Sequence, residues 1–241
     1  MKAPIDITQS HAITPGSTLN GGPTQTRSLA SLQRMIAAAR DFMLKRGNEE
    51  FTLQEVSRAG KVSIGSIYHR FAGKEDLVRA VIAAELAHIA VAETRMIEGV
   101  LAKSKSLTDY VPRFVVGFAE NLRKHSLMMR LAMQRASFDA QMLGTGNRSA
   151  LQAATKASKA MLTFRSEIAG DADTKARITF QMIFATLARH LSLDTRDPMA
   201  MNEDWQLLVD ELSWMALSYL IGARPSDRLA GKNRTKRARS R

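Results

Sequence analysis

The stretch Phe51-Thr-Leu-Gln-Glu-Val-Ser-Arg-Ala-Gly-Lys-Val-Ser-Ile-Gly-Ser-Ile-Tyr-His-Arg-Phe-Ala-Gly-Lys-Glu-Asp-Leu77 predicts two short helices, a tight turn between them and the start of a third helix. Thr52 and Glu55 have the spacing of a capping box, in which each side chain bonds the other residue's backbone N–H. Phe51 and Val56 occupy the positions of a hydrophobic staple. Both patterns predict that a helix begins directly after Thr52.

Glycine and serine mark the ends of these predicted helices. Gly60 is expected to end the first helix, because glycine accepts the left-handed backbone found there. Ser63 is expected to be the N-cap of the second helix, and Gly73 that of the third. This layout is typical of a helix-turn-helix, whose second helix enters the major groove of DNA.

The second helix has an apolar side and a polar side. Val62, Ile67 and Phe71 are expected to pack inward. The remaining positions carry hydroxyls, an aromatic ring and cations, which suit base edges and phosphates. With two flanking lysines and the first N-cap, the residues expected to contact DNA are Thr52, Lys61, Ser63, Ser66, Tyr68, His69, Arg70 and Lys74.

Alternatives remain for several of these side chains. Tyr68 could instead pack at a helix end, and His69 could be a solvated imidazole. Arg70 either contacts DNA or pairs with an acid such as Glu75 or Asp76. Lys74 stands in a first helical turn, where the helix dipole disfavours a cation, and a DNA phosphate would explain its presence.

The run Val62-Ser-Ile-Gly-Ser-Ile-Tyr-His-Arg-Phe71, followed by Gly73-Lys-Glu-Asp-Leu77, resembles the DNA-binding domain of the TetR/AcrR family of bacterial transcriptional regulators. The resemblance is strong from Ser28 to Val81 and only architectural beyond it. The family usually has glycine directly before the Val-Ser pair, where this chain has Lys61. This departure predicts a differently shaped turn and a further phosphate contact.

From Ser28 onward, apolar residues recur with helical periodicity and no run alternates as a strand would. The fold is therefore predicted to be all-α, with an N-terminal three-helix DNA-binding domain and a larger helical bundle for ligand binding and dimerisation. The predicted divisions are a flexible arm over 1–27, the helix-turn-helix domain over 28–73, the helical body over 74–223 and a basic disordered tail over 224–241.

Charge and composition limit the remaining possibilities. Of the formal net charge of +12, seven cations lie after residue 227 without any acid, which leaves 12 − 7, or +5, for the rest. The basic end either adds nonspecific affinity for nucleic acid or only solubilises the chain. The chain has no cysteine, no signal-peptide pattern and no apolar stretch long enough to span a bilayer, which favours the cytoplasm.

The last predicted helix, near residues 202–222, carries a seam of apolar residues that step by three and four, as in helix-on-helix packing. The bland interpretation is a buried core helix, and the functional one is a homodimer interface. The family resemblance implies the second, with the last two helices of each subunit forming a four-helix interface. The seam consists of Trp205, Leu208, Leu212, Met215 and Tyr219.

By the same resemblance, a small apolar or amphipathic ligand binds inside the body, moves the helix that begins after Gly73 and releases a palindromic double-stranded operator. Repression is implied in the same way. Aromatic residues of the body could line such a cavity, although they could equally be ordinary core. The candidates are Phe114, Phe118, Phe164 and Phe184.

Two other classes of protein remain as alternatives. The chain could be a structural DNA-binding protein of low specificity without an inducer. An enzyme is disfavoured, because the five histidines have no metal-ligand spacing and the sequence has no nucleophile elbow or phosphate loop. Neither a cofactor, a metal nor a catalytic residue is predicted.

Overall fold

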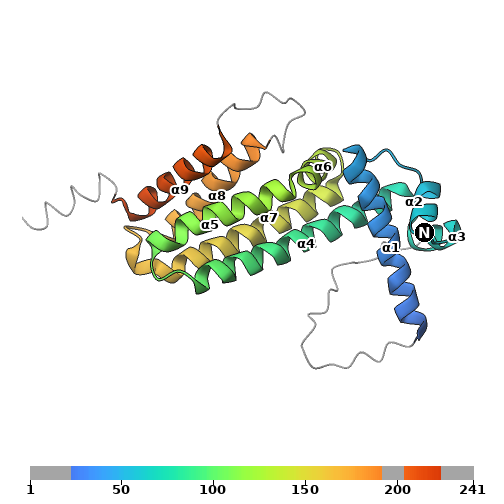
Figure 1. Cartoon of the computed structure of the whole chain (residues 1–241), viewed down its shortest axis with the longest axis horizontal. Helices are drawn as coiled ribbons and strands as arrows, with labels where there is room; N and C mark the ends of the chain where they lie inside the picture. Colours follow the sequence, from blue (N-terminus) through green and yellow to red (C-terminus); the bar gives the residue numbers. More distant parts are fainter. Residues whose placement is uncertain (1–22, 192–203, 224–241) are drawn as a thin grey trace, which may run out of the picture.

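The structure is a computed structural model that describes residues 23–191 and 204–223, and within them every regular element is a helix. The predicted all-α class is confirmed. Figure 1 shows a small head joined to an elongated body. In chain order, the elements are α1 (Pro23–Arg46), α2 (Leu53–Ala59), α3 (Ile64–Arg70), α4 (Lys74–Ala102), α5 (Leu107–Lys124), α6 (Ser126–Ala136), α7 (Ala140–Met161), the 3-10 helix η1 (Leu162–Glu167), α8 (Ala172–His190) and α9 (Trp205–Ile221).

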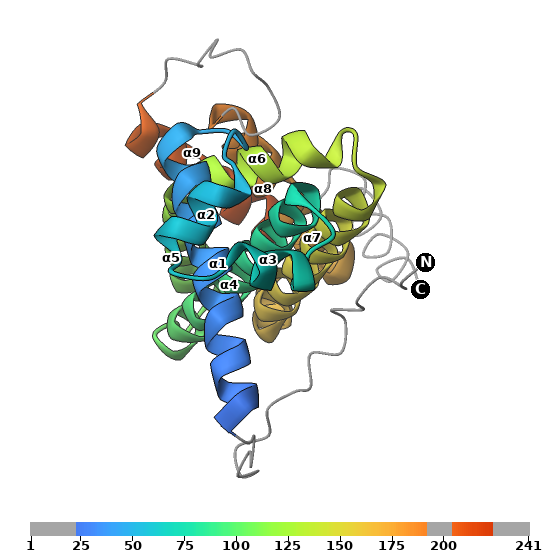
Figure 2. The same cartoon turned by 90° about the vertical axis from the view of Figure 1, so that its right-hand side faces the viewer.

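The head consists of α1, α2, α3 and the first turns of α4. Figure 2, which views the molecule from this end, shows α1, α2 and α3 in front of the body. Met35, Ala39 and Met43 recur on one face of α1 and are fully buried against Val56 of α2 and Ile67 of α3. This periodic apolar stripe is what holds the three helices together.

Local hydrogen bonds set the helix ends of the head. Thr52 and Glu55 form both halves of the predicted capping box, and the Ser63 side chain accepts the Ser66 N–H as predicted. The carboxylate of Glu55 also accepts a hydrogen bond from Arg46 at 2.7 Å. That bond, followed by those from Thr52, lowers the pKa of Glu55 to about 2.

The turn between α2 and α3 differs from the prediction in its backbone. Gly60 is not left-handed, since its φ is −79°, and the left-handed residue is Lys61 with φ +50°. Gly60 is needed for a different reason. A Cβ at this position would lie 3.0 Å from the Val56 carbonyl oxygen and 3.1 Å from that of Arg34. Glycine therefore allows the turn to pass directly against α1.

Helix α1 begins at Pro23 rather than at Ser28, so the predicted flexible arm is too long at its end. Proline is tolerated in a first helical turn, where its missing N–H has no partner in the helix. The rest of the predicted arm, and the basic tail after residue 223, lie outside the described residues. The predicted division at residue 73 falls on Gly73, the N-cap of α4.

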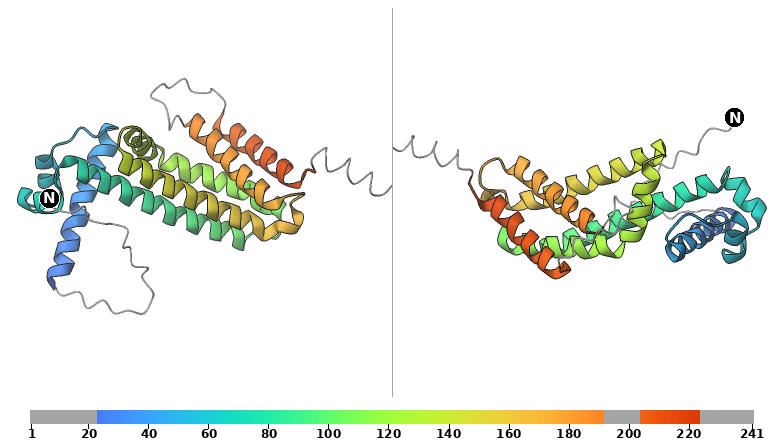
Figure 3. Two further views of the ribbon diagram at one scale, coloured as in Figure 1. Left: turned by 180° about the vertical axis from the view of Figure 1, so that it is seen from behind. Right: turned by 90° about the horizontal axis from the view of Figure 1, so that it is seen from above.

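The body is built on three long helices, α4, α5 and α7, which lie side by side in Figure 1 and Figure 3. The pair α8 and α9 covers them at the end away from the head. Tyr110, Phe114, Ile183 and Leu187 are fully buried in the core of this bundle. No helix among the described residues is long and apolar enough to cross a bilayer.

Helix α6 connects the two parts of the molecule. Its Met128 and Leu131 belong to the apolar cluster of the head, together with Met142 of α7 and Leu77 and Val81 of α4. The head is therefore packed against the body through buried side chains of α6 and α7, in addition to its covalent connection through α4.

Candidate nucleic-acid interface

Helix α3 presents one face to the head's core and the opposite face to solvent. Ile67 is 0% exposed, whereas its neighbour Tyr68 is 57% exposed. Ser63 and His69 are exposed as well, and Ser66 is half-buried. An exposed tyrosine beside hydroxyls and an imidazole, on the second helix of a helix-turn-helix, is suited to contact DNA.

A groove of about 480 Å³ runs between α3 and the first half of α1. Its lining residues are serines, arginines, a histidine and a glycine. Four of them were not among the predicted contacts, three from α1 and Gly65 from α3. The lining residues are Arg27, Ser28, Ser31, Ser63, Gly65, Ser66, His69 and Arg70.

Arg70 does not pair with either of the acids considered from the sequence. Its Nη2 donates to the backbone carbonyl and to the hydroxyl of Ser28, each at 2.6 Å. Glu75 and Asp76 instead pair with Arg135 and Arg79. Arg70 therefore holds α3 against α1 and fixes the width of the groove between them.

The other predicted contacts have neighbours that affect their roles. The Thr52 hydroxyl accepts the Glu55 N–H, and the Ser63 hydroxyl lies 2.8 Å from that of Ser66. The Lys74 ammonium lies 5.2 Å from the centre of the Phe51 ring. A cation–π contact therefore offers a second explanation for the cation at this helix N-terminus. Lys61 is exposed.

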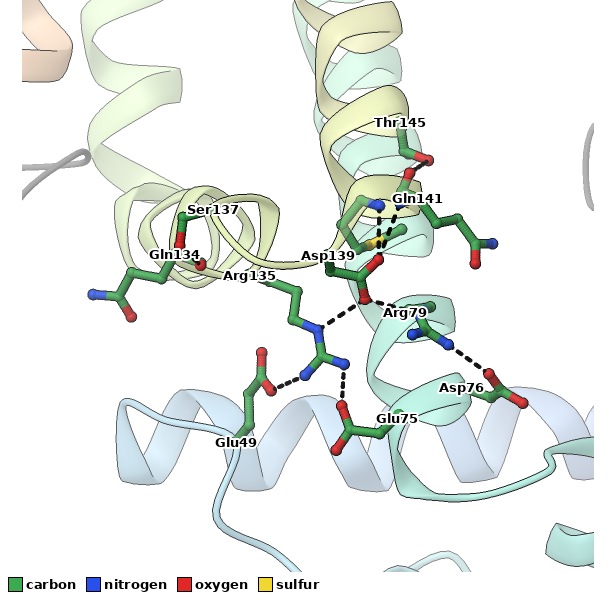
Figure 4. A network of polar contacts seen from close by, with 11 residues as sticks. Glu49, Glu75, Asp76, Arg79, Gln134, Arg135, Ser137, Asp139, Gln141 and Thr145 are labelled. Carbon is green, nitrogen blue, oxygen red and sulfur yellow. Dashed lines mark hydrogen bonds and ion pairs between the residues drawn. The ribbon is translucent and has the colours of Figure 1, made fainter.

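A buried arginine joins the head to the body at the start of α7 (Figure 4). Arg135 of α6 is 5% exposed and donates to Glu49, in the loop before α2, at 2.7 Å. It also pairs with Glu75 in the first turn of α4 and with Asp139, the N-cap of α7, the latter at 3.1 Å. Arg79 donates to Asp139 at 2.8 Å. A movement of α6 would thus pull on two acids of the head.

A second polar contact lies further along α4. Arg40 of α1 donates two hydrogen bonds to Glu85, at 2.6 and 3.1 Å, and His125 Nδ1 lies 3.1 Å from the same carboxylate. Burial by itself would raise the pKa of Glu85, but the hydrogen bonds from Arg40 and His125 outweigh it and the pKa is lowered. The Glu85 carboxylate is therefore charged and links α1 to α4.

The body contains a cavity of about 440 Å³ bounded by α4, α5, α6, α7 and α8. Two of the four candidate aromatic residues, Phe118 and Phe184, lie on its wall together with Phe180. Phe114 and Phe164 do not line it, because they pack against Tyr110 with ring centres 5.6 Å away. Periodicity alone could not separate aromatic residues of the core from those of a cavity wall.

The predicted dimer seam is divided between the two faces of α9. Leu212 is 4% exposed and packs inside the protomer with Val209, Ala216 and Leu220, so it faces the protomer's own core. Met215 is 50% exposed. Trp205, Leu208 and Tyr219 are half-buried. The exposed apolar face consists of Leu207, Trp214, Met215 and Ile221, which we call the outer stripe of α9.

Comparisons with known proteins agree with this geometry. Residues 35–81 match the family described as bacterial regulatory proteins, tetR family. A TetR-family transcriptional regulator from Mesorhizobium loti has a TM-score of 0.66 at 15% identity, covering 81% of this chain and 96% of its own. One from Syntrophomonas wolfei has 0.59 at 12% identity, covering 80% and 95%.

A fatty acid degradation regulator from Bacillus halodurans has a TM-score of 0.54 at 14% identity, covering 78% of this chain and 94% of its own. At these identities the solved structures establish the fold. No curated protein matches the chain in sequence. Within the described residues, no group of three or more His, Cys, Asp or Glu side chains is placed to hold a metal ion.

Proposed function

We propose that this chain is a DNA-binding transcriptional regulator of the TetR family, and that it acts as a homodimeric repressor of a palindromic operator that a small ligand releases. The match of residues 35–81 to the tetR family supports the first part. The observation that carries the DNA-binding part is the contrast within α3. Ile67 anchors the helix with no exposed surface, while Tyr68 beside it is 57% exposed. The family's usual lack of catalysis is consistent with a binding role.

In this proposal, α3 enters the major groove and its neighbours hold the DNA backbone. Ser66, Tyr68 and His69 contact base edges and the adjacent phosphates. Lys61 and Lys74 contact phosphates on either side of α3, as does Thr52 at the start of α2. The groove beside α3 adds Arg27 from α1. Its side chain is exposed and forms no ion pair with an acid among the described residues. Phosphate contacts of this kind position the helix, and base contacts specify the sequence.

Dimerisation is supported by the outer stripe of α9. Leu207, Trp214 and Ile221 are separated by seven residues each, so they lie along one side of the helix. All three are at least 50% exposed in the single protomer. A twofold contact through this face would place two heads on half-sites about 34 to 36 Å apart, which requires an approximately palindromic operator.

Ligand release is supported by the position of the cavity between the two apolar clusters. Ile82 and Met142 line the cavity and belong to the head's cluster, whereas Phe118 and Phe180 line it and belong to the body's core. Helix α6 has cavity residues on one face and carries Arg135 on another. A ligand that fills the cavity would therefore act on α4 and α6, and through them on the head.

The alternative is a structural DNA-binding protein of low specificity. Both candidates bind DNA with a strong salt dependence, so salt alone does not separate them. The ratio of specific to nonspecific affinity does, since a regulator prefers its site by about a thousandfold or more. The cavity favours the regulator, because a protein that only coats DNA has no use for a ligand site.

The proposal is tested by selecting genomic fragments that the full chain binds and sequencing them. A regulator should enrich one approximately palindromic motif upstream of a small number of genes. Tyr68→Ala should then lose that motif while its circular dichroism and thermal midpoint stay unchanged, because Tyr68 is exposed. Arg165→Ala, which removes an exposed cation of the body, is the matched control and should keep it. Enrichment without any shared motif would favour the structural protein.

A further inference from the structure

One wall residue of the body cavity differs in kind from the rest. The α4 residues that line it are Ile82, Leu86, Ile89 and Glu93, spaced at i, i+4, i+7 and i+11. This is the spacing of a single helix face, and the first three positions are apolar. Glu93 thus stands where the pattern predicts another hydrophobic residue, and among the described residues it is the only charged side chain on the cavity wall.

The Glu93 carboxylate has no counter-ion at contact distance. Among the described residues, it takes part in no hydrogen bond and no ion pair. Lys156 of α7 acts on Glu93 through its charge, but it is not on the wall, and its ammonium donates to Thr94 Oγ1 at 2.8 Å. Among the described residues, those that line the wall from α5, α6, α7 and α8 carry no charge, and the polar ones are Ser137, Asn147 and Ser149. No second charged group therefore faces Glu93 on this wall.

The environment of Glu93 is costly for a bare carboxylate. Burial raises the pKa of Glu93 from 4.5 to about 7, and the charge of Lys156 counteracts this only in part. Native proteins rarely leave a carboxyl in apolar surroundings without a partner, and such groups concentrate at binding sites. A ligand that brings a positive charge would provide the missing partner.

The remainder of the wall suits the apolar part of such a ligand. Phe118 and Phe180 meet edge to face with ring centres 5.3 Å apart, and Phe184 stacks on Phe180 at 6.4 Å. Met129 and Met133 lie on the same wall. Aromatic faces attract cations, and methionine side chains adapt to aromatic or alkyl groups of irregular shape.

We propose that this cavity binds a hydrophobic organic cation, an amine or quaternary ammonium compound, with its charge at Glu93 and its apolar part against Phe118, Phe180 and Phe184. The inference rests on the proposed ligand-released regulator and specifies the class of ligand. An anionic amphiphile of the same size is disfavoured, because its charge would meet the Glu93 carboxylate and would not reach Lys156.

The test uses calorimetric titration of the full chain with three probes that share one alkyl chain, octyltrimethylammonium, octanol and octanoate, below their aggregation concentrations. The cation should bind at least tenfold more tightly than the alcohol, and the carboxylate most weakly. Glu93→Gln should remove that preference. Glu98→Gln, which changes an exposed acid of the same helix outside the cavity, should keep it.

The pH dependence gives a second readout that does not rely on the variants. The charge of octyltrimethylammonium is fixed, so any dependence comes from the protein. Because a group with a pKa of about 7 is about tenfold less ionised at pH 6 than at pH 8, affinity should rise about tenfold across this interval in the native chain and stay flat in Glu93→Gln.

Two outcomes would overturn the proposal. One is tighter binding of octanoate than of the cation, and the other is no binding of any probe by a chain that still retains its DNA site. In either case, DNA binding is measured separately by fluorescence anisotropy. If the native chain still binds its site, the proposed DNA-binding regulator is not contradicted. Loss of DNA binding in the native chain would instead contradict the regulator and not the cation site.

Discussion

Arg34 and Gly60 are joined by one hydrogen bond and lie too close together to leave room for a side chain at residue 60. The Arg34 Nε donates to the Gly60 carbonyl at 3.2 Å, and a Cβ on Gly60 would lie 3.1 Å from the Arg34 carbonyl oxygen. This close approach joins α1 to the turn that precedes α3. The position of α3 relative to α1 therefore depends on the absence of a side chain at residue 60.

Gly60→Ala should destabilise the head by about 1 to 3 kcal/mol, because the added methyl meets backbone oxygens that cannot rotate away. Gly65→Ala is the matched control, since a Cβ there meets nothing within 4 Å. It should not lower the free energy of unfolding, but it should weaken DNA binding if α3 lies flat against the groove. Urea unfolding of both variants checks this, and equal stability of the two would show that the turn can shift.

The Lys61→Gly variant should be more stable than the Lys61→Ala variant. Within the described residues it is the only non-glycine residue with positive φ, and left-handed backbone costs an ordinary residue roughly 1 to 2 kcal/mol. The free energy of unfolding of Lys61→Gly should be about 1 kcal/mol higher than that of Lys61→Ala. Both variants should lose about one unit of the salt slope of DNA binding if Lys61 contacts a phosphate. An unchanged slope would limit Lys61 to a structural role.

The parts of the fold that were predictable from sequence are those decided by neighbours in the chain. Thr52, Glu55 and Ser63 form their caps within three residues, so the spacing alone specifies them. The start of α7 is hard to place from sequence, because its cap, Asp139, is followed by Gly144 and Gly146, which weaken the helical pattern. Local chemistry also could not show that Lys61, not Gly60, takes the left-handed conformation.

The parts of the site that were not predictable depend on residues far apart in sequence. The partner of Arg70 is Ser28, which precedes it by 42 residues and lies on another helix. In α9, the periodicity fits both an inward and an outward stripe, and only packing against α5 shows that Leu212 faces inward and Trp214 outward. The same limit applies to Phe114, whose apolar character fits core and cavity equally.

Glu93→Gln should stabilise the ligand-free protein increasingly as the pH rises. A raised carboxyl pKa means that the folded state holds its proton more tightly than the unfolded state, so the native chain loses stability between pH 4.5 and about 7. At 1.36 kcal/mol per pH unit, the gain of the variant above pH 8 is at most about 3 kcal/mol and should vanish near pH 4.5. Denaturant unfolding at several pH values measures it. Glu98→Gln should show no such trend.

Arg135→Met should cost about 2 to 3 kcal/mol of stability, near the lower end for a broken buried ion pair. The cost is limited because Asp139 keeps its bond to Arg79 at 2.8 Å and Glu75 is 58% exposed and can be rehydrated. Arg165→Ala, which breaks an exposed pair with Asp173, should change stability by less than about 0.5 kcal/mol. The two variants are compared by thermal and urea unfolding.

Arg135→Met also tests how the head and body communicate. If α6 transmits the ligand signal through Arg135, the variant should bind its operator but release it less completely when the cavity is filled. Competition between operator and octyltrimethylammonium measures this coupling. A full ligand response in a folded Arg135→Met protein would show that the apolar contacts of Met128 and Leu131 are sufficient.

Substitutions on the two faces of α9 should separate subunit association from folding. Trp214 is 66% exposed, so Trp214→Glu should leave the protomer folded but convert the dimer to monomer, since a carboxylate would be desolvated at the centre of the outer stripe. Leu212 is 4% exposed, so Leu212→Ala should cost about 2 to 5 kcal/mol of stability and keep the dimer. Light scattering after size-exclusion chromatography gives the mass, and far-ultraviolet circular dichroism reports folding. If Trp214→Glu keeps the dimer mass, the interface lies elsewhere. If it is a folded monomer that binds half-sites only weakly, the outer stripe is required for operator recognition.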